Sequence, residues 1–332
     1  ENRNLIINGA MQVSQRGTSE TGITSSQYAD APDRFYIGLT TAGTWTASQS
    51  TDAPVGFSNS YKLDCTTADS SLAAGDLLVF QQAIEAQNLQ HLKKGTSSAE
   101  SVTVSFHVKS NKTGTYIAEL YDADNTRQIS QAYTISSANT WEKKTLTYAG
   151  DTTGALNNDN GIGLYLVLWL AAGSSYSSGT LSTSWTTVTN ANRAVGVVNL
   201  ADSTDNEWYI TGVQLELGEQ ATPFEHRSFG DELNRCLRYF NRAEESGGGA
   251  YNWAFPIAGA SQVFRRLNYI FPVPMRTTPS LLNGVAGNAG GSVTDITVES
   301  GNTRSIIVNI DLDSASDTAY CWFQEGDFSA EL

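Results

Sequence analysis

The chain has 332 residues, with 34 acidic side chains against 20 basic ones and a formal net charge of −14. This length predicts about two domains, each able to bury a core. Hydrophobic residues make up 40% of the chain and charged residues 16%, which argues against disorder. The acidic balance excludes binding to a nucleic-acid backbone, and the longest apolar run, 162–172, is too short to span a membrane. We expect a soluble, β-rich protein without a signal peptide, because no apolar segment follows the first residues.

Cysteine and histidine add little to this description. The three cysteines lie far apart, which predicts buried free thiols in a protein made in a reducing cytoplasm: Cys65, Cys236 and Cys321. The three histidines have no metal-binding spacing, so a zinc site is not expected: His91, His107 and His226.

In residues 1–228, apolar and polar side chains alternate with the period of two that is typical of β-strands. Apolar and polar residues alternate from Ser101 to Lys109, a turn follows at 111–114, and alternation resumes to Leu120. This pattern predicts a hairpin with one buried face. Further alternation at 143–148, 163–170, 194–200 and 207–217 predicts an antiparallel jelly-roll sandwich.

The period changes after Phe229. Four apolar residues fall on one face of a helix of about 14 residues, namely Leu233, Cys236, Leu237 and Phe240. Ser228 resembles an N-terminal cap, and the glycines at 247–249 end the helix. We therefore predict a jelly roll over 1–228, a linker helix and glycine-rich joint over 229–249, and a smaller β-sandwich over 250–332.

Aromatic residues in polar surroundings are the best candidates for a binding site. Trp45, Tyr176 and Trp185 lie among Ser, Thr and Gly, where a ring can stack on a sugar. The alternative is that these rings cover the core from strand ends. Trp141, Trp169 and Trp208 lie on strands and are assigned to packing.

Two loops rich in oxygen ligands are candidates for calcium. One contains Asp151 and residues 157–160, and the other contains Asp202, Asp205, Asn206 and Glu207. Neither has EF-hand spacing, so turn residues are the simpler interpretation. We expect no cofactor, with structural Ca²⁺ as the open alternative.

No motif of an enzyme is present, and no catalytic residue is assigned. We interpret the paired carboxylates, such as Asp311 and Asp313, as residues of solvated turns or strand edges. A glycan-processing enzyme would need two carboxylates about 5–10 Å apart in a groove, a separation that sequence does not show.

Several segments together resemble bacteriophage tail-fibre and other virion proteins. Residues 4–18 (NLIINGAMQVSQRGT) resemble the opening of such proteins, and 208–218 with 221–227 resemble the end of the same module. Residues 80–85 and 102–106 are similar to the middle strands of carbohydrate-binding-module-like jelly rolls. Residues 232–240 resemble the "ELxxCxRYF" helix that follows this module, and 271–279 are similar to part of the C-terminal domain.

The resemblance implies a virion structural protein, made in the host cytoplasm and exposed on the particle as a fibre or adhesin component, commonly trimeric. Host-surface glycans and other virion proteins are the implied partners. We expect the helix stripe to form a three-fold interface through Leu233, Leu237, Phe240 and Arg238. The alternative is a capsid or tail decoration protein with a structural role and no sugar binding. The resemblance supplies no sugar-binding residues.

Overall fold

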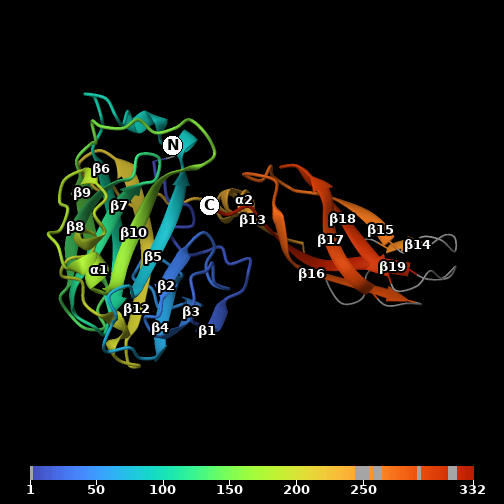
Figure 1. Ribbon diagram of the computed structural model, residues 1–332, viewed down its shortest axis with the longest axis horizontal. Helices are drawn as coiled ribbons and strands as arrows, with labels where there is room; N and C mark the ends of the chain where they lie inside the picture. Colours follow the sequence, from blue (N-terminus) through green and yellow to red (C-terminus); the bar gives the residue numbers. More distant parts are fainter. Residues whose placement is uncertain (1–2, 244–253, 257–263, 290–292, 313–319) are drawn as a thin grey trace. The chain divides into compact units, whose positions relative to one another are not determined.

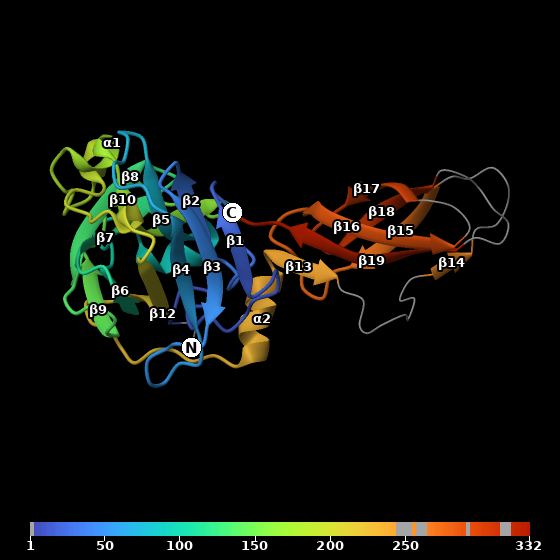
Figure 2. The ribbon, with the colours of Figure 1, turned by 90° about the horizontal axis from the view of Figure 1, so that it is seen from below.

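The computed structural model describes residues 3–243, 254–256, 264–289, 293–312 and 320–332 (Figures 1 and 2). The chain divides into two compact units. Unit 1 comprises Glu1–Glu232 with Leu332, and unit 2 comprises Leu233–Glu331. Both are built from antiparallel strands, and the helices of the described residues are short, so the all-β class expected from the sequence is confirmed.

Unit 1 is a sandwich of two six-stranded sheets. In spatial order, sheet A contains β1 (Ser19–Ile23), β3 (Thr44–Ser50), β4 (Ser60–Thr67), β12 (Glu207–Leu217), β6 (Val102–Ser110) and β9 (Glu142–Tyr148). Sheet B contains β11 (Thr186–Thr187), β8 (Arg127–Ile135), β7 (Gly114–Asp122), β10 (Ile162–Ala172), β5 (Leu77–Glu85) and β2 (Tyr36–Thr40). Short helical turns connect some strands: η1 (Ala86–Leu92), α1 (Ser174–Ser177), η2 (Asn190–Asn192) and η3 (Leu200–Asp202).

The core of unit 1 lies between the two sheets and follows from the period-two pattern. Val104 and Phe106 of β6 point into it from sheet A, and Leu120 of β7 points into it from sheet B. The ring of Phe80 stacks on Phe35 at 4.7 Å and meets Trp208 edge-on at 5.3 Å. Burial of these rings supplies much of the hydrophobic stabilisation of the unit.

Strands β6 and β7 do not form the expected hairpin. Strand β6 pairs with β12 and β9 in sheet A, while β7 pairs with β8 and β10 in sheet B. The turn before Gly114 therefore carries the chain from one sheet to the other. The prediction of a hairpin was wrong because alternation reports which face of a strand is buried, but not which strand lies beside it.

A third layer covers part of the outer face of sheet B, on the side away from sheet A (Figure 2). It is formed by the segment 173–199, which includes α1 and η2. Tyr176 and Ala194 from this segment pack on Ile117, Val167 and Trp169, which point outward from β7 and β10. The segment thus covers part of the outer face of sheet B and leaves part of it open.

Unit 2 contains two smaller sheets around one hydrophobic cluster. The first sheet contains β13 (Phe240–Ala243), β19 (Tyr320–Ser329), β14 (Ala254–Pro256) and β16 (Ser280–Ala289), with β19 paired to the other three. The second contains β15 (Phe264–Ile270), β18 (Ser305–Leu312) and β17 (Val293–Gly301). Fully buried Val308 and Phe328 contribute to the cluster from one sheet each.

The helix after the first sandwich is shorter than expected. Helix α2 (Phe229–Leu237) has nine residues, and Phe240 already begins β13. The predicted cap is present, because the Ser228 hydroxyl accepts from the Asp231 amide at 3.2 Å and donates to its carboxylate at 2.6 Å. The helix ends at Leu237 because the chain continues directly into β13, which pairs with β19. The glycine-rich joint at 247–249 lies outside the described residues.

No helix in the described ranges is long and apolar enough to cross a membrane.

Candidate functional site

Trp45, predicted to be an exposed aromatic, is fully buried in the core of unit 1. It lies on β3, and its indole N–H donates to the Ala42 carbonyl at 2.8 Å. The prediction of a sugar-binding ring at Trp45 is therefore wrong. Its polar neighbours Thr44 and Thr46 belong to the opposite face of the strand, which is why the sequence around it looks exposed.

Tyr176 and Trp185 lie in two different clusters. Tyr176, on α1, packs against Trp169 with ring centroids 5.3 Å apart. Trp185 is partly buried against the main core, and its N–H donates to the Ala149 carbonyl at 2.7 Å. The ammonium of Lys94 lies 5.3 Å from the centroid of the Trp185 ring. The structure therefore does not bring the three predicted aromatics together.

The open part of the outer face of sheet B carries a different group of aromatic side chains. The strand register sets out three outward-facing rows: Tyr36–Gln81–Val167–Glu119–Ser130, Gly38–Val79–Trp169–Ile117–Ala132, and Ala83–Tyr165–Tyr121–Gln128. Tyr36, Tyr121 and Tyr165 of these rows are partly exposed. We call these three residues the tyrosine face.

Two rings of the tyrosine face lie close to each other, and the third lies beside a further tyrosine. The Tyr121 and Tyr165 centroids are 5.8 Å apart with planes tilted by 37°. Tyr36 meets the partly exposed Tyr28 edge-on at 5.0 Å. Burial raises the pKa of Tyr165, and neighbouring Tyr121 and Tyr36 raise it further, so the Tyr165 hydroxyl remains a neutral hydrogen-bonding group near pH 7.

A buried ion pair adjoins the tyrosine face. The carboxylate of Glu119 is fully buried and accepts two bonds from the Arg193 guanidinium, from Nε at 2.9 Å and from Nη2 at 3.0 Å. It also accepts the indole N–H of Trp169 at 2.8 Å. The guanidinium lies 5.1 Å from the ring centroids of both Tyr121 and Trp169. Desolvation raises the pKa of Glu119, and Arg193 opposes this shift.

These groups can bind a ligand through both apolar contacts and hydrogen bonds. Aromatic rings offer apolar faces, while the partly exposed Gln81 and the tyrosine hydroxyls offer hydrogen bonds on the same rigid sheet. Glu119 is the one carboxylate in the three rows, and its oxygens are already occupied.

Sequence reasoning missed the tyrosine face, although a signal was present. Tyr165 is an amphipathic residue within the otherwise apolar run 162–172, and Tyr121 ends the alternating strand that follows the turn at 111–114. A strand that is apolar on both faces has both faces covered, so a tyrosine at an outward position marks the place where the cover stops.

The loop with Asp151 holds a lysine at its centre. The ammonium of Lys94 contacts the Asp122 carboxylate, the Asp151 carboxylate at 3.0 Å, and the carbonyls of Thr153 and Gly154 at 3.1 and 2.9 Å. Asp151 is also paired with Arg127 at 2.6 Å. In the second loop, Asp202 pairs with Lys112. Within the described residues, no three His, Cys, Asp or Glu side chains gather as a metal site.

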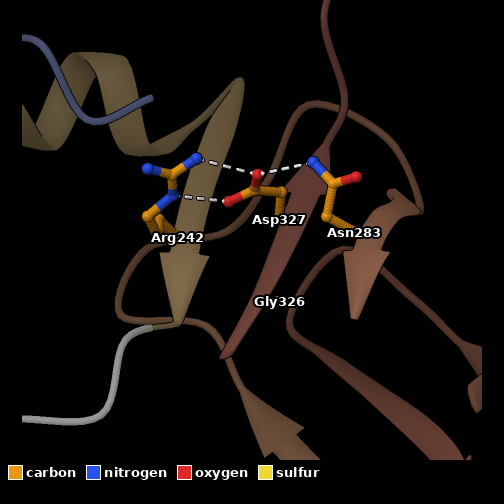
Figure 3. A pocket seen from close by; sticks show the side chains of 4 residues that line it. All are labelled: Arg242, Asn283, Gly326 and Asp327. Atoms are coloured by element: carbon orange, nitrogen blue, oxygen red, sulfur yellow. Dashed lines mark hydrogen bonds and ion pairs between the residues drawn. The ribbon is translucent and has the colours of Figure 1, made fainter. Parts of the chain in front are cut away.

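Unit 2 contains a polar cavity of about 200 Å³ lined by Arg242, Asn283, Gly326 and Asp327 (Figure 3). Asp327 accepts from Arg242 at 2.7 and 2.9 Å and from Asn283 at 3.0 Å. These side chains come from three adjacent strands, β13, β19 and β16, at one level of the register. The polar groups of this cavity are mostly directed at each other, so it is a weaker candidate for ligand binding than the tyrosine face.

The residues predicted to form a three-fold interface lie around the end of α2. Phe240 is buried within this chain at 1% exposure, while Leu233, Leu237 and Arg238 are half-buried. Cys236 of the same stripe is also fully buried. The stripe thus packs in part on the chain itself, and its use between copies stays a prediction.

No protein-family model matches this chain, and no curated protein sequence matches it. Solved structures do show similarity. The enzymatically active domain of tailspike protein 4 from bacteriophage CBA120 is 15% identical with a TM-score of 0.32, over 64% of this chain and 21% of that one. This chain therefore spans about a fifth of the length of that tailspike.

Two further structures are similar over a comparable part of this chain. A putative sugar-binding protein of Bacteroides thetaiotaomicron is 11% identical with a TM-score of 0.34, over 65% of this chain and all of that one. A family 22 carbohydrate-binding module of Clostridium thermocellum Xyn10B is 11% identical with a TM-score of 0.30, over 63% of this chain and all of that one. Likenesses of this size carry no argument about what this chain binds.

Proposed function

We propose that unit 1 is a glycan-binding module that acts through the tyrosine face. The observation that carries this proposal is the placement of Tyr121 and Tyr165 on the paired strands β7 and β10, with Tyr36 on β2 beyond β5, on the outer face of one partly uncovered sheet. Sugar rings have apolar C–H faces and polar edges, and this face offers aromatic rings with hydrogen-bonding groups between them. Since the sheet fixes the rings before the ligand arrives, little ordering is needed on binding.

We further propose that the protein is a non-enzymatic component of a bacteriophage particle, exposed as a fibre or adhesin that contacts host-surface glycans. Support comes from the sequence segments 4–18, 208–227 and 232–240, which resemble virion proteins. A homotrimer follows from the same resemblance. Native mass measurement tests this part, and a stable monomer at micromolar concentration would rule out the trimer.

A glycan array with the full chain tests the binding function. Removing one ring by Tyr165→Ala or Tyr121→Ala is expected to weaken binding to array hits by about tenfold, equivalent to about 1.4 kcal/mol. Trp141→Ala is the matched control, because Trp141 is a partly exposed aromatic next to Tyr209 on the outer face of sheet A. No binding above background by the wild type would reject the function and would favour a structural decoration protein.

A further inference from the structure

The charges around the tyrosine face restrict which glycans it can accept. In the three outward rows of sheet B, Glu119 is the single residue with a carboxylate or basic group. Glu85, at the end of β5, is fully buried. Outside these rows, the Arg16 guanidinium lies 5.3 Å from the centroid of the Tyr28 ring, which adjoins Tyr36. Within them, a ligand lying over Tyr36, Tyr165 and Tyr121 meets one charged pair, which is Glu119 with Arg193.

This charged pair is neutral as a unit. Two hydrogen bonds of 2.9 and 3.0 Å join Arg193 to both oxygens of Glu119, and the carboxylate is completely screened from solvent. Such a bidentate pair is geometrically fixed and its two charges cancel at a distance. The guanidinium thus has no spare positive charge with which to hold a second carboxylate.

The same geometry leaves one end of the guanidinium available. Nε and Nη2 face Glu119, while Nη1 has no hydrogen-bond partner in the described part of the chain. The Arg193 side chain is 19% exposed, and its guanidinium lies 5.1 Å from the centre of the Tyr121 ring. Nη1 is therefore a hydrogen-bond donor at the edge of the tyrosine face, held in place by a buried partner.

We propose that the tyrosine face accepts neutral glycans and discriminates against uronic and sialic acids, with Arg193 Nη1 donating to a sugar hydroxyl or ring oxygen and Glu119 acting as the positioning residue for Arg193. This inference rests on the proposed glycan-binding function. The net charge of −14 acts in the same direction, because it disfavours the approach of a polyanion.

A panel of soluble polysaccharides tests this specificity. The neutral probes are galactan, mannan and mixed-linkage glucan, and the acidic probes are polygalacturonate, alginate and polysialic acid, each measured at about 50 and about 500 mM NaCl. We expect binding to at least one neutral probe, with a Kd that changes less than about twofold with salt. Binding restricted to acidic probes, and weakened by salt, would overturn the inference while leaving glycan binding intact. If neither this panel nor the array gives a hit, the proposed function itself fails.

Variants of the ion pair test the role of Arg193. Arg193→Lys retains the positive charge but removes the planar guanidinium with its several N–H donors. We expect it to weaken neutral-probe binding by about tenfold without creating affinity for acidic probes. The double variant Glu119→Gln/Arg193→Gln keeps the site neutral and controls for folding, which circular dichroism monitors. If Arg193→Lys and the folded double variant both bind the neutral probe as the wild type does, Arg193 is not a ligand contact.

Discussion

Lys94 shows how a single side chain decides the chemistry of a loop. Its exposed fraction is 4%, and its ammonium is surrounded by two carboxylates and two carbonyl oxygens. Sets of oxygens of this kind also attract Ca²⁺. Here the cation belongs to the protein, and Asp151, which the sequence offered as a calcium ligand, is bound by Lys94 and Arg127 instead.

Replacing this buried cation should be strongly destabilising. Lys94→Met leaves Asp122 and Asp151 with less positive charge in a buried setting, and we expect the free energy of unfolding to fall by about 3–5 kcal/mol. Urea denaturation measures this change. Lys93→Met is the control, because Lys93 is 54% exposed and forms a surface pair with Glu100 worth at most about 1 kcal/mol. Equal effects of the two substitutions would contradict the assignment.

His107 should make unit 1 sensitive to pH. Burial lowers the pKa of its imidazole below the ordinary value of 6.5, and Lys143 lowers it further. The unfolded chain therefore binds a proton more readily, so stability is full above about pH 6.5 and falls as pH decreases toward the folded-state pKa. His107→Phe keeps the contact with Phe57, whose ring lies 5.3 Å away, and should flatten this part of a plot of Tm against pH. His91→Gln, at an exposed site on η1, is the control for replacing a histidine elsewhere in unit 1.

At the residue scale, the sequence identified aromatic side chains but did not show toward which face of its sheet each one points. Trp45 and Tyr165 both lie on strands, yet Trp45 points into the core and Tyr165 points out of sheet B. The polar neighbours of Trp45 predicted exposure, and the apolar neighbours of Tyr165 concealed it. The direction of a side chain depends on the parity of the strand register and on the covering layer. The covering segment 173–199 was not recognisable from its period, because the alternation at 194–200 predicted a strand and no strand forms there.

At the scale of elements, the central strand β12 contains an irregularity that depends on glycine. The register between β12 and β6 shifts between Thr211 and Gln214, and Gly212 has φ of +63°. A Cβ atom at Gly212 would lie 2.6 Å from the Phe57 ring and 3.0 Å from the His107 ring. The bulge and the close approach both require a residue without a side chain.

The substitution Gly212→Ala is therefore expected to destabilise unit 1 by more than the cost of the backbone conformation alone. That backbone cost is about 1 kcal/mol for a non-glycine residue with positive φ. Gly56→Ala is the matched control, because Gly56 has φ of +97° and no atom lies within 4 Å of the place that a Cβ would occupy there. Thermal unfolding should place the Tm of Gly212→Ala below that of Gly56→Ala, and the reverse order would refute the steric argument.

The Arg242–Asp327–Asn283 cluster joins three strands of unit 2. Asp327→Asn keeps the size of the side chain but leaves Arg242 without its charged partner, and we expect a loss of about 1–3 kcal/mol in the stability of β19. Hydrogen exchange of the β19 amides measures the local effect. Asp295→Asn, at an exposed carboxylate on β17, should leave the exchange rates unchanged; a comparable increase in both variants would argue against a specific role of the cluster.

Strand positions were more predictable than strand partners. The alternation at 163–170 lies within β10 (Ile162–Ala172), and the alternation at 207–217 is β12 (Glu207–Leu217). The assignment of β6 and β7 to one hairpin failed, and the helix after Ser228 ended early, because both outcomes depend on contacts distant in sequence. Periodicity is a local property, whereas pairing is decided by the whole sandwich.

At the scale of the whole molecule, the division near Glu232 is supported by hydrogen bonds that hold this residue to unit 1. Glu232 accepts from the Asn8 amide at 2.6 Å and from Arg227 at 3.3 Å. The first residues and the last segment of unit 1 are joined as well, because Glu225 accepts from the amides of Arg3 and Asn4 at 3.1 and 2.9 Å. The first and last segments of unit 1 are thus hydrogen-bonded to each other, and the unit has its own hydrophobic core.

A fragment of residues 1–238, which keeps α2 whole, should therefore fold without the rest of the chain. We expect one cooperative urea transition and the same glycan-array hits as the full chain, because the tyrosine face and the Glu119–Arg193 pair lie entirely within unit 1. The fragment carrying Glu225→Ala, which loses the contacts to Arg3 and Asn4, should unfold at lower urea concentration. A fragment that aggregates or unfolds without cooperativity would show that unit 1 depends on unit 2 for stability. A folded fragment that gives none of the array hits would show that the glycan site does not lie on the tyrosine face.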